Sequence, residues 1–137
     1  MDVNRCFVDT WFWIAVINEK DQHHRKARDI LARTRAARLI TTEMVIAELL
    51  NMYAGKGSFW RSKVVQFVDG LRKDKRTTIV EQTPEQFFKA FGKYKLHVDK
   101  EWGLTDCASF VLMEEQSLQY ALTDDRHFEQ AGFIKAI

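Results

Sequence analysis

Five carboxylates stand out because each lies next to a predicted strand end or in a helix beside one. The ends of parallel strands meet at one edge of a sheet, so carboxylates placed there can converge on a single site. Carboxylates only a few ångströms apart do not all stay ionised unless cations neutralise them. The members of this acidic set are Asp9, Glu48, Asp106, Asp124 and Asp125.

The chemistry expected of the acidic set is metal-dependent hydrolysis of phosphodiester bonds. Ligands that supply only oxygen favour Mg²⁺ or Mn²⁺ over Zn²⁺. Such a cation positions a water molecule, lowers its pKa and contacts a phosphoryl oxygen. A structural alternative exists for Asp124, which can cap the short helix that follows it. Glu48 is harder to explain structurally, because apolar residues flank it at helical spacing and a carboxylate there needs a partner or a cation.

Short apolar runs alternate with amphipathic helical patterns, which predicts an α/β fold with a parallel sheet. Thr10 is expected to cap the first helix, and Thr83 to cap a later one that starts at Pro84, with Gln86 placed to reach back to the cap. The predicted strands are residues 5–8, 39–41, 77–80 and 120–122, with 133–137 as a last edge strand.

Length and composition indicate one domain spanning residues 1–137 with a substantial core. The chain is 46% hydrophobic and 29% charged, as is usual for soluble globular proteins. No apolar run approaches the roughly 20 residues that span a bilayer, and no signal-peptide pattern opens the sequence, so we expect no membrane association and a cytoplasmic location. Cys6 and Cys107 lie in apolar stretches and are predicted to be core thiols.

Basic residues dominate the chain outside the acidic set. Of the 19 acidic residues five belong to that set, which leaves 14 against 21 lysines and arginines and favours a polyanionic partner. The predicted helix within 22–35 presents either an ordinary solvated face or a phosphate-contacting one. Arg126 could contact a phosphate or pair with a neighbouring aspartate. The candidate phosphate-contacting residues are Arg25, Lys26, Arg28, Arg33 and Arg126.

The four histidines show no spacing typical of a metal site and are predicted to lie at the surface or at helix ends. They are His23, His24, His97 and His127.

Trp11, Phe12 and Trp13 are three consecutive aromatic residues at the start of the first predicted helix. Successive helical side chains point about 100° apart, so one sheet face does not cover all three. We expect at least one to be exposed at an association surface of a homodimer or protein partner, with Trp11 or Trp13 in the contact. The alternative is that the core takes all three.

Four stretches of the chain resemble the PIN domain, and most of all its VapC-type ribonuclease toxins. They are F-V-D-T-W-F-W-I-A at 7–15, T-T-E-M-V-I-A-E-L-L-N at 41–51, L-T-D-C-A-S-F at 104–110 and A-L-T-D-D-R-H-F-E-Q-A-G-F at 121–133. The likeness covers essentially the whole chain. It implies a three-layer α/β/α sandwich around a parallel sheet of about five strands.

The same resemblance implies roles for individual residues. Asp9, Glu48, Asp106 and Asp125 would bind Mg²⁺ or Mn²⁺, with Asp125 preferred to Asp124 because the family pattern is T-x-D-x-x-F. The residues expected beside these ligands are Thr10, Thr123 and Asp124.

The function that the resemblance implies is an endoribonuclease that acts on single-stranded RNA. A cognate antitoxin and a homodimer are further expectations from the family. The alternative is a PIN module that binds RNA or a protein without cutting. Trp11 stands where many relatives have Ser or Asn, which narrows the space beside Asp9 and raises the question of substrate access.

Overall fold

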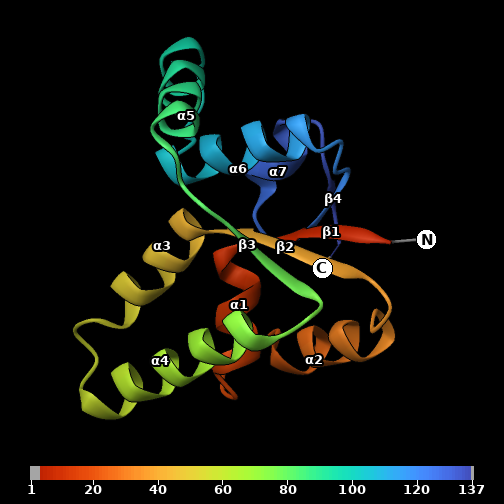
Figure 1. Cartoon of the computed structure of the whole chain (residues 1–137), viewed down its shortest axis with the longest axis vertical. Helices are drawn as coiled ribbons and strands as arrows, with labels where there is room; N and C mark the ends of the chain where they lie inside the picture. Colours follow the sequence, from red (N-terminus) through yellow and green to blue (C-terminus); the bar gives the residue numbers. More distant parts are fainter. Residues whose placement is uncertain (1–3, 137) are drawn as a thin grey trace.

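A parallel five-stranded sheet forms the centre of the computed structural model, which describes residues 4–136. The strands lie in the order β3-β2-β1-β4-β5, so the first strand in the sequence is the middle strand of the sheet (Figure 1). They are β1 (Arg5–Val8), β2 (Arg38–Thr42), β3 (Thr77–Val80), β4 (Tyr120–Leu122) and β5 (Ile134–Lys135).

The five predicted strands are therefore confirmed in position. β2 is longer by one residue at each end than predicted, and β5 is shorter. Ile137, the last residue of the predicted edge strand, lies outside the described residues.

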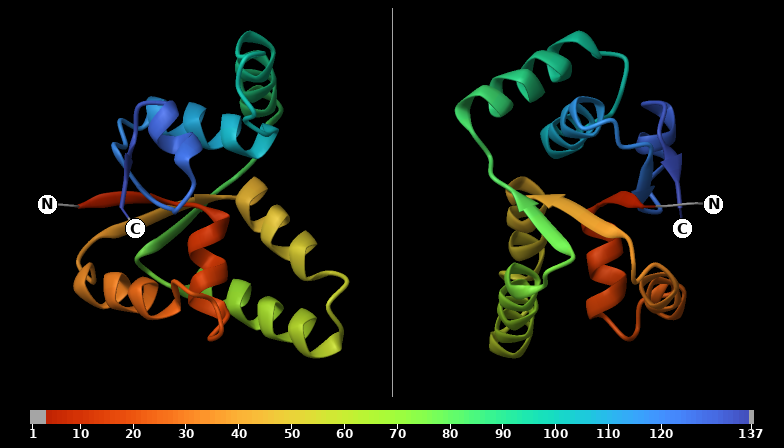
Figure 2. Two further views of the ribbon diagram at one scale, coloured as in Figure 1. Left: turned by 180° about the vertical axis from the view of Figure 1, so that it is seen from behind. Right: turned by 45° about the vertical axis from the view of Figure 1, so that its right-hand side comes forward.

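Helices cover both faces of the sheet, which confirms the predicted three-layer α/β/α sandwich. Figures 1 and 2 show two groups of helices with the sheet between them. One group consists of α1 (Thr10–Ile17), α2 (His24–Arg33), α3 (Glu43–Tyr53) and α4 (Ser58–Lys73), and the other of α5 (Pro84–Leu96), α6 (Leu104–Glu115) and α7 (Arg126–Gln130). Between residues 4 and 136, no helix has the length and apolar character needed to cross a membrane.

The core extends from β1 and α1 to buried residues of β2, α3, α6, β4 and α7. Cys6, Phe7 and Val8 are fully buried because helices cover both faces of the central strand. Both free thiols, Cys6 and Cys107, are buried as predicted, and burial raises the pKa of Cys6 to about 11. These two cysteines are therefore unreactive parts of the core.

The three consecutive aromatic residues of α1 separate into one exposed and two buried side chains. Trp13 packs edge-on against Phe67 of α4, at 5.6 Å between ring centroids, and its Nε1–H donates to Thr41 Oγ1 at 3.4 Å. Phe12 and Trp13 are each 1% exposed, whereas Trp11 is 51% exposed. The expectation of at least one exposed aromatic is confirmed, and the suggestion that Trp13 lies at an association surface is wrong.

The cap of α1 also differs from the prediction. The helix starts at Thr10, so Asp9 and not Thr10 occupies the cap position. The Thr10 hydroxyl is buried and has no hydrogen-bond partner within the described part of the chain.

The start of α5 follows its sequence pattern only in part. The Thr83 hydroxyl accepts a hydrogen bond from the Gln86 backbone N–H at 3.1 Å, which confirms Thr83 as the cap. The side chain of Gln86 does not reach back as predicted, because its Nε2 donates to Glu115 of α6 at 2.7 Å. Only Ala90 of α5 is buried, so the aromatic side chains of this helix lie outside the core: Phe87, Phe88, Phe91 and Tyr94.

Thr83→Ala is expected to lower the free energy of unfolding by about 1 kcal/mol, because the Gln86 N–H loses its acceptor. Urea denaturation measures this loss. Thr83→Ser is the control, since it keeps the hydroxyl and should lose much less. Equal losses in the two variants would show that the Thr83 methyl group and not the cap stabilises α5.

Candidate active site

Asp106, Asp125 and His127 form a compact group at the start of α6 and α7. One ligand atom of each lies within 4.8 Å of the others. His127 Nδ1 is 3.2 Å from Asp106 Oδ2 and 3.4 Å from Asp125 Oδ1. All three side chains are partly buried, so the group can hold a metal ion and remain accessible.

Backbone contacts position both carboxylates of this group. Asp106 Oδ2 accepts a hydrogen bond from the Gly103 N–H at 3.0 Å, just before α6. Asp125 Oδ1 accepts from the His127 N–H at 2.9 Å and thereby caps α7. The structural alternative for Asp124, in which it caps this helix, is therefore excluded. Burial and the charge of Asp125 raise the pKa of Asp106, although hydrogen bonds from Gly103 and His127 oppose the rise.

Asp9 directly follows β1, is connected to the Asp125 segment through Thr123, and is only 3% exposed. The Thr123 hydroxyl donates to Asp9 Oδ2 at 2.9 Å, and Thr123 Oγ1 also accepts from the Asp125 N–H at 3.0 Å. Thr123 thus connects Asp9 to the segment that carries Asp125. Burial raises the pKa of Asp9 to about 7, and the charges of Asp106 and Glu48 add to the rise.

Glu48 lies in α3 and is partly buried. Its charge contributes to the raised pKa of Asp9, but Glu48 is not a member of the compact group, and neither is Asp9. Within residues 4–136 no ion pair compensates Glu48. Asp106 and Asp125 therefore meet closely, and Asp9 and Glu48 lie near enough for their charges to interact with this pair or with each other.

Two histidines belong to this region, which the sequence interpretation missed. His127 lies at a helix end, as expected, but it is also a member of the compact group, which its spacing from other histidines did not indicate. His23, just before α2, places its Nε2 3.0 Å from Asp124 Oδ2. The signal for His127 was its position two residues after Asp125, in the first turn of the helix that Asp125 caps.

Asp124 takes part in a different set of contacts from Asp125. Its carboxylate pairs with His23 at 3.0 Å and with Lys135 Nζ at 3.7 Å, and its side chain is 48% exposed. The geometry therefore brings Asp125, and not Asp124, next to Asp106.

A cavity of about 570 Å³ opens beside the compact group. Arg126 in its lining is exposed and makes no ion pair within the described residues, so of the two alternatives for Arg126 the pairing with Asp124 or Asp125 is absent. The site residues that line the cavity are Trp11, His23, Asp124, Asp125, Arg126 and His127.

The basic residues predicted on the second helix are exposed on α2. This helix starts directly after His23, which lines the cavity. The four side chains are those of Arg25, Lys26, Arg28 and Arg33.

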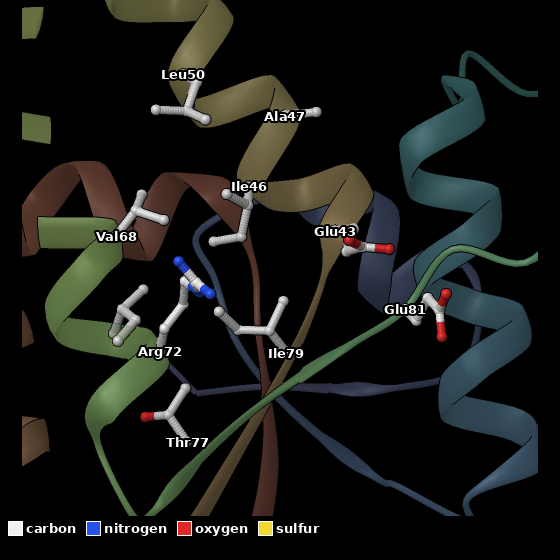
Figure 3. A pocket seen from close by; sticks show the side chains of 10 residues that line it. Glu43, Ile46, Ala47, Leu50, Val68, Arg72, Thr77, Ile79 and Glu81 are labelled. Atoms are coloured by element: carbon white, nitrogen blue, oxygen red, sulfur yellow. The ribbon is translucent and has the colours of Figure 1, made fainter. Parts of the chain in front are cut away.

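A second cavity, of about 580 Å³, lies between α3, α4 and β3. Figure 3 shows apolar side chains such as Ile46 and Leu50 on its walls, with Arg72 reaching into it. Its acidic lining residues are Glu43 and Glu81, and neither belongs to the acidic set. The candidate chemistry is therefore confined to the first cavity.

The chain matches a known protein family and a known endonuclease over nearly its whole length. The sequence model of the PIN domain matches residues 6–134. The chain is 27% identical over 132 residues to the 23S rRNA-specific endonuclease VapC20 of Mycobacterium tuberculosis, and the alignment covers 94% of this chain and 95% of that protein.

Two solved structures share the fold. The crystal structure of M. tuberculosis VapC20, described as a sarcin-ricin loop cleaving toxin, has a TM-score of 0.84 at 24% identity and covers 96% of this chain and 98% of that chain. VapBC2 from Rickettsia felis, bound to a DNA fragment from its promoter, has a TM-score of 0.66 at 15% identity and covers 96% and 97%.

Proposed function

The chain belongs to the PIN domain family, and from this premise we propose that it is a metal-dependent endoribonuclease that hydrolyses phosphodiester bonds in single-stranded RNA. The observation that carries the proposal is the compact group of Asp106, Asp125 and His127, to which Thr123 connects the buried Asp9. Its homologue VapC20 carries the name of a 23S rRNA-specific endonuclease, so 23S ribosomal RNA is the first substrate to test.

The donor set of the site fits a divalent cation. Asp106 and Asp125 would hold Mg²⁺ or Mn²⁺, with His127 as a nitrogen donor and Asp9 and Glu48 as further carboxylates. An imidazole nitrogen suits a transition metal better than Mg²⁺, which favours Mn²⁺. When bound, the cation would lower the pKa of a water molecule and stabilise negative charge on the phosphoryl group.

The protein's own part in the reaction is to orient these groups and the RNA. Thr123 holds Asp9 by its hydroxyl, and the Gly103 N–H holds Asp106, so neither carboxylate has to reorganise during the reaction. Arg126 is free of ion pairs with other described residues and would contact a phosphate beside the scissile one.

We further propose that the chain is the toxin of a toxin–antitoxin pair and forms a homodimer. The support is the likeness to VapC20, which is described as a toxin, and the exposed aromatic face of α5. Exposed apolar faces of this kind are typical of surfaces that bind proteins.

The proposed activity is tested by incubating the purified protein with 23S ribosomal RNA and with unstructured RNA, in Mn²⁺, in Mg²⁺ and in a chelator. Cuts mapped by primer extension should appear only with the metal ions. RNA binding without any cutting in Mn²⁺ would favour the alternative, a PIN module that binds but does not cleave.

Charge reversal of Arg25, Lys26, Arg28 and Arg33 to Glu is expected to weaken RNA binding and to flatten its dependence on salt. The removal of one phosphate contact should reduce the slope of log K against log[salt] by about 0.7 for a single strand. Fluorescence anisotropy over a salt series, with Asp106→Asn to prevent cleavage, measures the slope. Reversal of the exposed Arg72, Lys73 and Lys75 is the control. If the control flattened the dependence of log K on log[salt] and the α2 variant did not, residues 72–76 and not α2 would contact the RNA.

A further inference from the structure

We propose that Trp11 is a stacking platform for a nucleobase of the RNA, next to the bond that is cut. The proposal rests on the nuclease function above and names a subsite of it. Trp11 lines the same cavity as Asp125 and His127, at the second position of the helix that Asp9 caps. The cavity that a phosphate would enter to reach the compact group is therefore also the cavity that this indole ring lines.

The exposure of Trp11 is unusual for its position. Residues 12–17 of α1 are all buried, and only Trp11 on this helix leaves about half of its surface, 51%, open to solvent. An indole ring that is half exposed at the wall of a cavity gains less from packing within the fold than a buried one does. It offers an aromatic face to a ligand instead, and every nucleobase has a face that can stack on it.

Trp11 also separates two cavities. On its other side lies a smaller one, of about 260 Å³, lined by Tyr53, Lys56 and Trp60 among others. The rings of Tyr53 and Trp60 stack with centroids 5.3 Å apart, and Lys63 Nζ lies 5.0 Å from the Trp60 centroid. Trp11 thus lines both cavities, with Arg126 in the lining of one and Lys56 and Trp60 in the lining of the other.

The combination of cations and aromatic rings in these two cavities favours a nucleic acid over a protein ligand. Proteins that bind single strands combine cations that follow the phosphates with aromatic rings that stack on the bases. The same cavity is lined by the candidate metal ligands Asp125 and His127, and a metal ion held there would bind a phosphate of the RNA. A protein partner would explain the exposed indole, but not the acidic and cationic residues that line the same cavity.

The test is a double-mutant cycle between the protein and the RNA. The probe is a short fluorescein-labelled RNA that spans a cut site mapped in the cleavage assay, with one nucleotide at a time replaced by an abasic one. All proteins carry Asp106→Asn, so binding is measured by anisotropy without cleavage. Trp11→Ala should weaken binding about tenfold or more, whereas Trp11→Phe should keep most of the affinity.

The decisive result is non-additivity at one position. If the Trp11 ring stacks on a base, then removing that base should cost the Trp11→Ala variant almost nothing further, because both changes delete the same contact. Abasic changes elsewhere should weaken both proteins equally. Val98→Ala is the control, since Val98 is 87% exposed but lines neither cavity and lies outside α5.

Several outcomes would overturn the proposal. They are unchanged RNA affinity in Trp11→Ala, additive effects at every abasic position, and a melting temperature lowered enough to explain the loss. If sedimentation velocity showed that Trp11→Ala only dissociates a homodimer, Trp11 would belong to a protein interface. If the wild type cleaves RNA and Trp11→Ala binds RNA as tightly as the wild type, only the role of Trp11 is contradicted. If the wild type neither binds nor cleaves RNA, the proposed function is contradicted as well.

Discussion

Asp106→Asn abolishes metal-dependent cleavage and leaves the fold intact: this is the largest functional effect that we expect. The amide keeps an oxygen to accept the Gly103 N–H but lacks the negative charge that a cation requires. The variant also removes one of two neighbouring carboxylates, Asp106 and Asp125, so the metal-free protein should be no less stable. Cleavage of RNA in Mn²⁺ measures the first effect, and thermal melting without metal the second.

Metal binding gives this prediction a readout that does not depend on activity. At a Mn²⁺ concentration about 100 times the Kd, binding stabilises the wild type by about 2.7 kcal/mol, and its melting temperature rises. Asp106→Asn should lose most of that rise. The matched control is Asp124→Asn, because Asp124 pairs with His23 and Lys135 and not with the compact group. If Asp106→Asn kept the full rise and Asp124→Asn lost it, the metal site would lie around Asp124.

Local patterns were sufficient to predict most of the fold. Cys6, Phe7 and Val8 form an apolar run that ends at Asp9, which is typical of a buried parallel strand. Thr83 and Pro84 fix the start of α5 through interactions within one turn. Features of this kind depend only on neighbouring residues, so the sequence alone predicted them.

The features that could not be predicted depend on contacts between distant segments. The side chain of Gln86 bonds Glu115, 29 residues further along the chain, and so does not complete its own cap. Asp124 and Asp125 are adjacent, and only the contacts of His23 and Lys135 with Asp124 separate their roles. Sequence patterns describe a residue's own helix or strand and contain little information about such partners.

His127 was missed for a related reason. Histidine ligands were sought by their spacing from other histidines, whereas the partners of His127 are two carboxylates, one of them 21 residues away. Because Asp125 caps α7, His127 lies in the first turn of that helix. There its side chain contacts Asp106. A search for His two residues after a strand-end aspartate would have found it.

Asp9→Asn should stabilise the metal-free protein at neutral and alkaline pH. Burial raises the pKa of Asp9 from 3.8 to about 7, so the folded protein binds a proton here more tightly than the unfolded chain does. The stabilisation is fully present below pH 3.8 and is lost as the pH rises through about 7. A shift of this size corresponds to a cost of at most about 4 kcal/mol for the ionised wild type at high pH. The neutral amide avoids this cost.

Urea denaturation in a chelating buffer at about pH 5 and about pH 8 measures the effect. The advantage of Asp9→Asn over the wild type should grow with pH, whereas the exposed Asp124→Asn should show no such trend. An equal difference at both values would mean that Asp9 ionises normally despite its burial. Added Mn²⁺ should reverse the order at pH 8, because a cation compensates the charge of Asp9 in the wild type and finds less charge in the variant. The unfavourable energy of the ionised Asp9 would then be the part of the folding free energy that metal binding recovers.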